Sequence, residues 1–477
     1  MNAISRPSPR TDVVLLGLLY AAEFFALTMA LSLHRLGDRS LASSIFSTPG
    51  LGFVVSLIAF VSALALIAYR YRRARRSGSR GFGLTVAMNL ITLALVFIPV
   101  EIAVRLLVHH TPDTTVFRNT VLLPRSWQDT AASNQQVFDK ASGDLSYLVY
   151  DDALGWTVGA NRRGGDGMYL SSAEGLRAAS QGAVLAGPKM RHRVAIVGDS
   201  FVFAERVTFE DSWGHLLEAN SGGKLEVLNF GVGGYAIDQA YLRFKKDILG
   251  WQPDIAILAF PLADFHRTVT VYPFINWPEW GVPFSKPRIV RDGSALKVLN
   301  VPTIAPPAMF SKASIADLPL LEHDAGYRAR DWRWSLTDAS YAKRALFSAL
   351  APGSQPGPQV SEDELIGVNA AILQAFIKLA NENGIIPMIA YLPSWPEIER
   401  LSRGGKSPGL RIMHQTGVAF VDATPCVLEV GATAGYVPDD PHYSARGNAA
   451  VAKCIGSAVE QIVAQRPAPQ PAAPPRQ

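Results

Sequence analysis

The chain has 477 residues, of which 48% are hydrophobic and 18% charged, and its formal net charge is +5. This length can bury a large core and allows more than one structural unit. The positive charge is concentrated in residues 1–112, which hold 11 Arg and 4 acidic residues, so the rest of the chain, with 34 basic and 36 acidic residues, is slightly acidic. We therefore expect no nucleic-acid partner, because no basic domain is left to bind phosphates.

Three long apolar segments occupy most of residues 1–112, at residues 13–33, 51–69 and 82–107. Each has about the length that a helix needs to cross a bilayer. The sequence thus predicts a membrane anchor of three transmembrane helices over residues 1–112. For the first segment, a cleavable signal peptide is the alternative.

Basic residues flank these segments on one side. Arg6 and Arg10 precede the first segment, and the run "RYRRARRSGSR" separates the second from the third. The positive-inside rule places both in the cytoplasm and everything after the third helix outside it. Cys426 and Cys454 would then face an oxidising compartment, where they could pair, although two buried free thiols fit the sequence equally well.

Two acidic residues fall within the apolar segments, Glu23 in the first and Glu101 in the third. An acid inside a membrane helix suggests a function. The structural alternative is that Glu23 is bonded to a neighbouring helix and that Glu101 pairs with Arg105, four residues further on.

The chain after residue 112 divides into two parts that differ in their pattern of polar and apolar residues. Residues 113–192 form a polar, turn-rich lead-in for which short strands and loops are expected, and residues 193–465 alternate short apolar runs with helical stretches. The predicted strands are residues 194–197, 226–229, 255–260, 385–391 and 419–422. Such alternation predicts a parallel sheet with helices on both faces, which binds ligands beyond the carboxyl ends of its strands.

A long interruption follows the third predicted strand. Residues 269–358 contain no comparable strand, and they include Trp277, Trp280, Trp332 and Trp334. Because structureless loops of this length are rare, we interpret them as an inserted cap beside the site. The tryptophans could stack on sugar rings, or they could pack the cap onto its domain. Residues 466–477, "RPAPQPAAPPRQ", read as a disordered Pro-rich tail.

The first predicted strand runs directly into a polar pair in "RVAIVGDSFVFAERV", where Asp199 and Ser200 follow the apolar run. Asp and Ser at this place commonly cap a helix, so the tripeptide alone is a weak signal for catalysis. In "VPDDPHYSARG", Asp439 lies three residues before His442. It could hold Nδ1 of the imidazole and leave Nε2 to take a proton from a serine hydroxyl. The structural alternative is a polar turn in which Asp440 and Pro441 set the bend.

A glycine cluster, "NFGVGGY", ends the second predicted strand. Glycine allows the close approach and unusual torsions with which a backbone amide can face a developing oxyanion. Gly234 is the predicted donor, together with the amide of Ser200. The predicted site is therefore catalytic Ser200, Asp439 and His442, with Ser200 and Gly234 forming the oxyanion hole.

These segments together resemble the SGNH or GDSL hydrolase superfamily, whose sequence blocks supply a nucleophilic Ser, an oxyanion Gly, an oxyanion Asn and a DxxH pair. The resemblance covers roughly residues 145–465, and "LGWTVGANRR" is similar to the lead-in of membrane-anchored bacterial members. It implies an α/β fold, a flavodoxin-like three-layer parallel sheet, here preceded by the three transmembrane helices. It also implies a bacterial inner membrane location, with the catalytic domain in the periplasm or otherwise extracytoplasmic.

The third block departs from the family pattern. In "PDIAILAFPLADFHR", Ala263 stands at the Asn position and Asp264 keeps the acid. An alanine side chain cannot donate to an oxyanion. The substrate, or a neighbour such as His266 or Arg267, could fill the gap; alternatively the enzyme could be slow, or the site could only bind a ligand. Asp199, Asp264, His266 and Arg267 are the predicted neighbours of the site.

The function expected from these residues is that of a serine esterase acting on ester-linked acyl groups of envelope or exported glycans or lipids, with no cofactor and no metal. A polysaccharide O-acyltransferase is one alternative, and a separate membrane acyltransferase is then a hypothetical partner. A catalytically impaired glycan-binding or scaffold protein is the other, and Ala263 is its best support.

Overall fold

The computed structural model describes residues 20–21, 48–76, 87, 91, 97–111, 114–141, 147–293, 295–350 and 356–465. The chain divides into two compact units. The first unit comprises residues 1–130 and 328–356, and the second comprises residues 131–327 and 357–477. The predicted tail, residues 466–477, lies outside the described residues.

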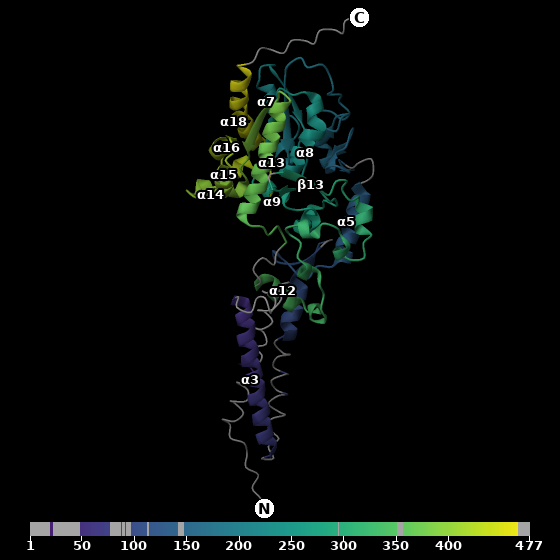
Figure 1. The fold of residues 1–477 in the computed structure, drawn as a ribbon, viewed down its shortest axis with the longest axis vertical. Helices are drawn as coiled ribbons and strands as arrows, with labels where there is room; N and C mark the ends of the chain where they lie inside the picture. Colours follow the sequence, from purple (N-terminus) through teal and green to yellow (C-terminus); the bar gives the residue numbers. More distant parts are fainter. Residues whose placement is uncertain are drawn as a thin grey trace, which may run out of the picture. The chain divides into compact units, whose positions relative to one another are not determined.

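The first unit contains the long helix α3 (Thr48–Arg76), which includes the predicted segment 51–69 (Figure 1). No helix of the described residues is both long enough and apolar enough to cross a membrane. Apart from residues 20–21, the predicted segment 13–33, with Glu23, lies outside the described residues, as do most of residues 82–96. The three-helix anchor therefore stays a prediction.

The rest of the first unit is held together around helical residues 97–107. Three short antiparallel strands follow, and the unit is completed by α12 (Tyr341–Leu350); the strands are β1 (Val108–His110), β2 (Thr115–Phe117) and β3 (Thr120–Val121). The Glu101 carboxylate accepts backbone N–H bonds from Tyr341 (3.0 Å) and Ala342 (2.8 Å), so it caps the start of α12. Arg105 pairs with Glu101 at 2.7 Å, which confirms the predicted local pair.

The second unit is built on a five-stranded parallel sheet in the order β10-β9-β11-β14-β15. Its strands are β9 (His192–Gly198), β10 (Leu225–Asn229), β11 (Ile255–Phe260), β14 (Ile386–Tyr391) and β15 (Val421–Asp422). Numbered along the chain, this order is 2-1-3-4-5, which is the flavodoxin-like arrangement. The predicted parallel sheet is confirmed.

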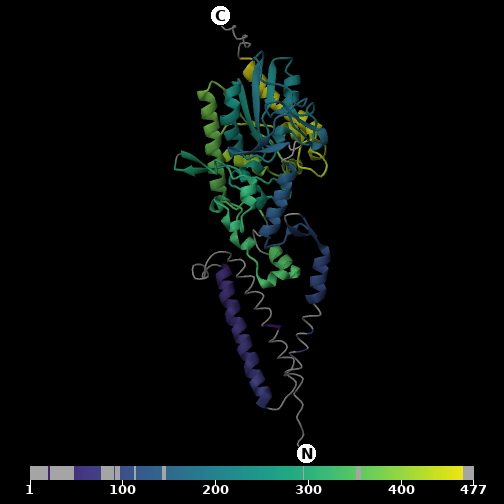
Figure 2. The ribbon, with the colours of Figure 1, turned by 90° about the vertical axis from the view of Figure 1, so that its right-hand side faces the viewer.

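Alternate residues of the central strands enter two separate cores, because successive side chains of a strand point to opposite faces. Ala195, Val197 and Leu258 pack with α8 (Ile237–Arg243) and α13 (Glu362–Glu382) on one face. Val194 and Ile196 pack on the other face with α7 (Trp213–Ala219), α16 (Thr424–Val430) and α18 (Ala445–Val463). Figure 2 shows the sheet between α13, in green, and the yellow C-terminal helix. The predicted three layers are therefore present.

Shorter elements surround this sheet in the second unit. The antiparallel pieces are β4 (Leu148–Asp151) with β5 (Gly155–Val158), the sheet of β6 (Arg163–Gly164), β7 (Tyr169–Ser171) and β8 (Arg177–Ala178), and the hairpin of β12 (Arg288–Asp292) and β13 (Ala295–Leu299). The remaining helices are α6 (Ser200–Phe203), α9 (Ala263–Thr268), α10 (Pro273–Asn276), α11 (Pro306–Phe310), α14 (Trp395–Ser402), α15 (Pro408–Gln415) and α17 (Ala432–Gly435). Helix α5 (Trp127–Ala141) begins in the first unit and continues into the second.

The division into units differs from the predicted domain boundaries at two places. Residues 131–192 of the predicted lead-in belong to the same unit as the sheet, and the predicted cap, residues 269–358, is split between the units after residue 327. The second part of the cap packs within the first unit, where the Arg344 guanidinium donates to the carbonyl of Leu122 at 2.8 Å and that of Pro124 at 3.1 Å.

A disulfide joins Cys426 on α16 to Cys454 on α18, with 6.0 Å between their Cα atoms. The bridge links two helices on the same face of the sheet. Of the two alternatives that the sequence left open, paired or free thiols, the structure has the pair.

Candidate active site

Ser200 lies at the carboxyl end of β9, where the chain turns into the short helix α6. All seven residues of β9 are buried, and Gly198 ends the strand where a Cβ atom would lie 2.1 Å from the Ala259 carbonyl oxygen, so only glycine fits. Asp199 is the N-cap of α6, and its carboxylate accepts the backbone N–H of Phe201 at 2.8 Å. Because Asp199 does the capping, the Ser200 hydroxyl is left for another partner.

That partner is His442, on the loop before α18. The Ser200 hydroxyl lies 2.8 Å from Nε2 of the imidazole, and Nδ1 lies 2.5 Å from a carboxylate oxygen of Asp440. Ser200 is 6% exposed, so the pair is largely shielded from water. The structure thus brings together two predicted residues that are more than two hundred positions apart in the sequence.

The carboxylate on Nδ1 belongs to Asp440, and the predicted pairing of Asp439 with His442 is wrong. Asp439 has a left-handed backbone conformation (φ 59°) and an exposed side chain. This turn lets the next residue fold back, so that Asp440 also accepts the backbone N–H of His442 at 3.0 Å. The acid is therefore two residues before the histidine, where the spacing had suggested three.

The surroundings of Asp440 keep its carboxyl ionised. Partial burial raises its pKa, but the hydrogen bonds from His442 and the charges of His442 and Arg206 outweigh this, so the pKa lies below its ordinary value. Arg206 Nε lies 2.7 Å from the second carboxylate oxygen, although its side chain is 56% exposed. A carboxylate at Nδ1 requires the proton on that nitrogen and leaves Nε2 as the acceptor for the Ser200 hydroxyl.

The loop after β10 is fastened to α6. The Asn229 side chain accepts the backbone N–H of Gly231 (2.8 Å) and donates to the Val202 carbonyl (2.9 Å). A Cβ atom on Gly231 would lie 2.3 Å from the backbone nitrogen of Phe203, so the loop and the helix touch through backbone. Gly234, the predicted oxyanion donor, follows in this loop with a φ of 78°, which favours glycine.

Three of the predicted neighbours form one buried cluster. Arg267 donates from a single terminal nitrogen to Asp264 (2.7 Å), to Asp199 (2.9 Å) and to the Tyr235 carbonyl (3.1 Å). Burial and the adjacent Asp199 carboxylate raise the pKa of Asp264, and Arg267 opposes the rise. The cluster links α9 to Asp199, the residue before Ser200. Its role in the structure is therefore to position the turn that carries Ser200.

Ala263 and His266, also in the altered third block, are less buried than Asp264 and Arg267. Ala263 is the first residue of α9 and is exposed. His266 is half-buried, and burial lowers its pKa. Among the described residues, no hydrogen bond joins His266 to Ser200 or His442.

Two buried residues of the predicted lead-in, Arg177 and Trp156, hold the end of α6 and the loop after β10. Neither was predicted from the sequence. Arg177 on β8 donates to the carbonyls of Phe203, Ala204 and Val207, so it terminates α6. Burial lowers the pKa of Arg177 to about 10, so the guanidinium stays charged at neutral pH. Trp156 donates to the Gly233 carbonyl at 3.0 Å and accepts the Tyr235 hydroxyl on its own carbonyl at 2.6 Å.

Glu205 is a further acidic residue at the site that sequence reasoning missed. Its carboxylate oxygen Oε2 lies 3.6 Å from Nε2 of His442, and its side chain is 29% exposed. The other oxygen lies close to Gly233, since a Cβ built there would be 2.4 Å from it. Burial raises the pKa of Glu205, and the charge of His442 partly opposes this. A charged residue within the apolar run "SFVFAERV" was the available signal.

The four predicted cap tryptophans fall into two groups. Trp277 and Trp280 stack on each other in the second unit (4.5 Å between centroids, 8° between planes), and Arg267 lies 4.6 Å from the Trp280 ring centroid. Trp332 and Trp334 belong to the first unit, where Arg125 packs on the Trp332 ring and Arg344 on that of Trp334.

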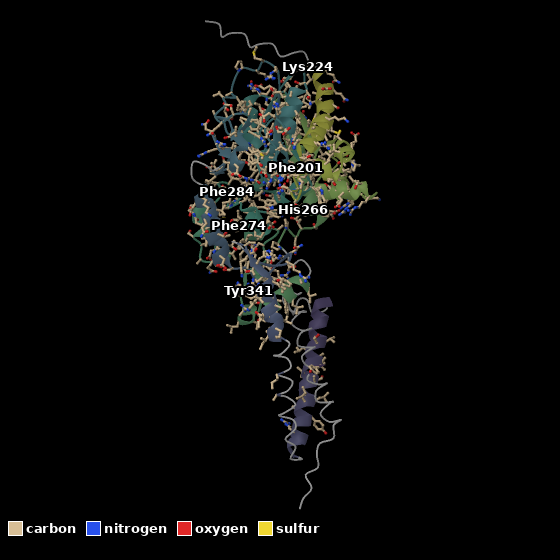
Figure 3. All side chains as sticks on the ribbon, turned by 180° about the vertical axis from the view of Figure 1, so that it is seen from behind. Phe201, Lys224, His266, Phe274, Phe284 and Tyr341 are labelled. Atoms are coloured by element: carbon tan, nitrogen blue, oxygen red, sulfur yellow. A yellow bond between two sulfur atoms is a disulfide. The ribbon has the colours of Figure 1, made fainter. Side chains whose placement is uncertain are left out.

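The site occupies the carboxyl ends of the strands, as parallel sheets favour. Figure 3 shows Lys224, just before β10, near the upper end of the molecule in that view, and Phe201, next to Ser200, lower down. A pocket of about 640 Å³ opens at the Lys224 end, lined by Met190, Lys224 and Val459 among others, and none of the predicted site residues lines it. Within the described residues, no group of three or more His, Cys, Asp or Glu is arranged to hold a metal ion.

No protein-family model matches the chain, and no curated protein matches it. Solved structures do match. An acetyl xylan esterase is 15% identical over 56% of this chain and 99% of its own, with a TM-score of 0.30. The esterase EstA from Pseudoalteromonas sp. is 10% identical (57% and 100% covered, TM-score 0.28), and a GDSL-like lipase from Bacteroides thetaiotaomicron is 14% identical (59% and 93%, TM-score 0.27).

Proposed function

We propose that the chain is a serine esterase that acts on ester-linked acyl groups. The observation that carries this proposal is the hydrogen-bonded series Ser200, His442 and Asp440. His442 Nε2 takes the Ser200 proton while Oγ attacks the ester carbonyl, and the alcohol leaves with that proton to give an acyl-Ser200 ester. Water then attacks the acyl carbonyl, and the proton that His442 takes from it passes to Ser200 Oγ as the free acid leaves.

The backbone amides of Ser200 and Gly234 form the oxyanion hole in this proposal. Ala263 supplies no side-chain donor, and the Arg267 nitrogen that approaches the site is already bound to three acceptors. Loss of one oxyanion donor lowers the rate on the order of 10²- to 10³-fold in other serine hydrolases. We therefore expect slow turnover.

Hydrolysis of a short-chain aryl ester by the full-length chain in detergent tests this proposal. Release of p-nitrophenol from p-nitrophenyl acetate that disappears in Ser200→Ala is the expected result. An acetyl group found on Ser200 by mass spectrometry would identify the nucleophile directly. Turnover that persists in Ser200→Ala would refute the assignment, and a chain that binds glycans without turnover would support the scaffold alternative.

The natural substrate in our proposal is an acylated glycan or lipid of the envelope, or an exported glycan. The half-buried stacked pair Trp277 and Trp280, in contact with Arg267, is the feature that favours a carbohydrate. The same acyl-enzyme would give an O-acyltransferase if a sugar hydroxyl replaced water. Mass spectrometry of an oligosaccharide acceptor incubated with the chain and an acyl donor separates the two outcomes.

We further propose that residues 1–112 anchor the chain in the bacterial inner membrane, with the N-terminus in the cytoplasm and the catalytic domain outside it. The three apolar segments and their flanking arginines support this, and the bridge between Cys426 and Cys454 suits an oxidising compartment. A reporter that is active only outside the cytoplasm, fused after residue 113, should be active. If the chain is a transferase, a membrane acyltransferase should co-purify with it.

A further inference from the structure

Glu205 places a second carboxylate beside the base, on the opposite ring nitrogen from Asp440. Asp440 contacts Nδ1, whereas Glu205 Oε2 lies 3.6 Å from Nε2, the nitrogen that receives the Ser200 hydroxyl. Glu205 is fixed there by its backbone, because its N–H donates to the Ser200 carbonyl at 3.0 Å at the end of α6. Its side chain is 29% exposed, so its carboxylate is within reach of solvent.

The base Nε2 changes partner during the reaction. In the free enzyme it accepts the Ser200 hydroxyl, but in the acyl-enzyme Oγ is esterified and carries no proton. Nε2 is then free to accept from the hydroxyl that attacks the acyl group. Two acceptors 3.6 Å apart can both be reached by one water molecule, whose hydrogen bonds to each are about 2.8 Å long.

We propose that Glu205 positions the water that hydrolyses the acyl-enzyme, which makes it a positioning residue for deacylation. This rests on the proposed function above. One O–H of the water donates to Nε2 and the other to the Glu205 carboxylate. As the water oxygen bonds to the acyl carbon, its proton passes to Nε2, while the second proton stays on the oxygen. The C–Oγ bond then breaks, Ser200 Oγ takes the proton from His442, and the carboxylic acid leaves.

The role is confined to one half of the reaction. During acylation Nε2 is engaged with Ser200, and no water is needed. An ionised Glu205 carboxylate accepts a hydrogen bond more strongly than its neutral form does, and burial raises its pKa, so deacylation should weaken as the pH falls through that pKa. The titratable and charged groups that interact with this carboxylate include His442, Asp199, Arg206, Asp440, Arg177, Tyr147 and Tyr169.

The kinetic constants of Glu205→Ala separate the two halves, because kcat/KM for an activated ester reports acylation and kcat reports deacylation when that step is slow. With p-nitrophenyl acetate, we expect kcat to fall about 10- to 100-fold, as for loss of one hydrogen bond to a charged group. The value of kcat/KM should stay within about twofold, and a burst of p-nitrophenol should appear as acyl-enzyme accumulates. Glu210→Ala, an exposed glutamate five residues further on, is the matched control and should change neither constant.

Methanol as a competing acceptor gives a second readout. Methanol has one O–H, which is needed by Nε2, so its attack does not use Glu205. In Glu205→Ala the ratio of methyl ester to free acid should therefore rise relative to the unmodified chain. Glu205→Gln keeps an acceptor oxygen of similar size and should restore part of kcat; it also serves if the alanine variant does not fold.

A fall of kcat/KM by the same factor as kcat, or an unchanged product ratio, would overturn the inference, because either would mean that Glu205 acts on acylation or only on the shape of the site. If the unmodified chain forms no acyl-Ser200, the proposed function itself has failed. If it does and Glu205→Ala leaves kcat unchanged, only the role of Glu205 has failed.

Discussion

Asp439 and Asp440 are adjacent residues with the same side chain, and only the second contacts His442. Asp440→Asn should therefore lower kcat by about 10²- to 10⁴-fold, because an amide cannot hold the imidazole in the tautomer that frees Nε2. Asp439→Asn, which changes an exposed side chain, should leave kcat within about twofold. Steady-state hydrolysis of p-nitrophenyl acetate compares the two. An equal loss in both variants would contradict the pairing.

The pKa of Asp440 also predicts how stability depends on pH. Its pKa in the folded chain lies below 3.8, the ordinary value, so ionised Asp440 stabilises the folded state above about pH 4. This contribution is lost as the pH falls below 4 and through the folded-state pKa. We expect the melting temperature of the unmodified chain to fall more steeply between about pH 5 and 3 than that of Asp440→Asn. Parallel curves would show that the pairing does not contribute.

The sequence allowed some of these residues to be predicted and not others. Ser200 and His442 could be predicted because each lies in a short motif next to a strand or helix end. Asp440 could not be separated from Asp439, because the choice depends on the left-handed turn at Asp439, which two adjacent aspartates do not specify. Glu205 depends on where α6 ends, and that end is set by Arg177, which comes from a distant strand.

The five strands of the sheet were predicted to within two residues at each end, because most of them are short apolar runs. Strand β11 has the predicted bounds, residues 255–260. The cap was predicted as one insertion and is divided, because residues 328–350 are held by Glu101 and Arg344 contacts within the first unit. Contacts between segments so far apart in sequence leave no local pattern.

The contact between the β10 loop and α6 can be tested at Gly231. A Cβ atom there would lie 2.3 Å from the Phe203 nitrogen and 2.7 Å from its Cα, and backbone cannot move aside cheaply. We expect Gly231→Ala to destabilise the chain by about 1–3 kcal/mol and to lower esterase activity, because the loop that carries Gly234 is displaced. Gly250→Ala is the control, since a Cβ at Gly250 meets no atom within 4 Å. The melting temperature and kcat of both variants test this. Equal melting temperatures and equal kcat values in the two variants would contradict the close approach of Gly231 to Phe203.

For the molecule as a whole, the bridge between Cys426 and Cys454 closes a loop with a sequence separation of 28 residues. A loop of this length contributes about 3–4 kcal/mol through the entropy of the unfolded chain. The double variant Cys426→Ala/Cys454→Ala should melt at a lower temperature than the oxidised chain, and reductant should lower the melting temperature of the unmodified chain only. A double variant that melts like the oxidised chain would show that helix packing alone holds α16 to α18.

The contacts of Arg177 and Trp156 also determine how short a working fragment of this protein can be. Both residues precede β9, yet one terminates the helix that carries Ser200 and the other braces the loop that carries Gly234. A truncation begun at Arg193 would remove Arg177, the side-chain donor to the carbonyls of Phe203, Ala204 and Val207. It would also remove Trp156, whose carbonyl accepts the Tyr235 hydroxyl. Expression trials for crystallisation should therefore start upstream of β4, since a fragment trimmed to the segments that carry Ser200, Gly234 and His442 would lack the residues that position them.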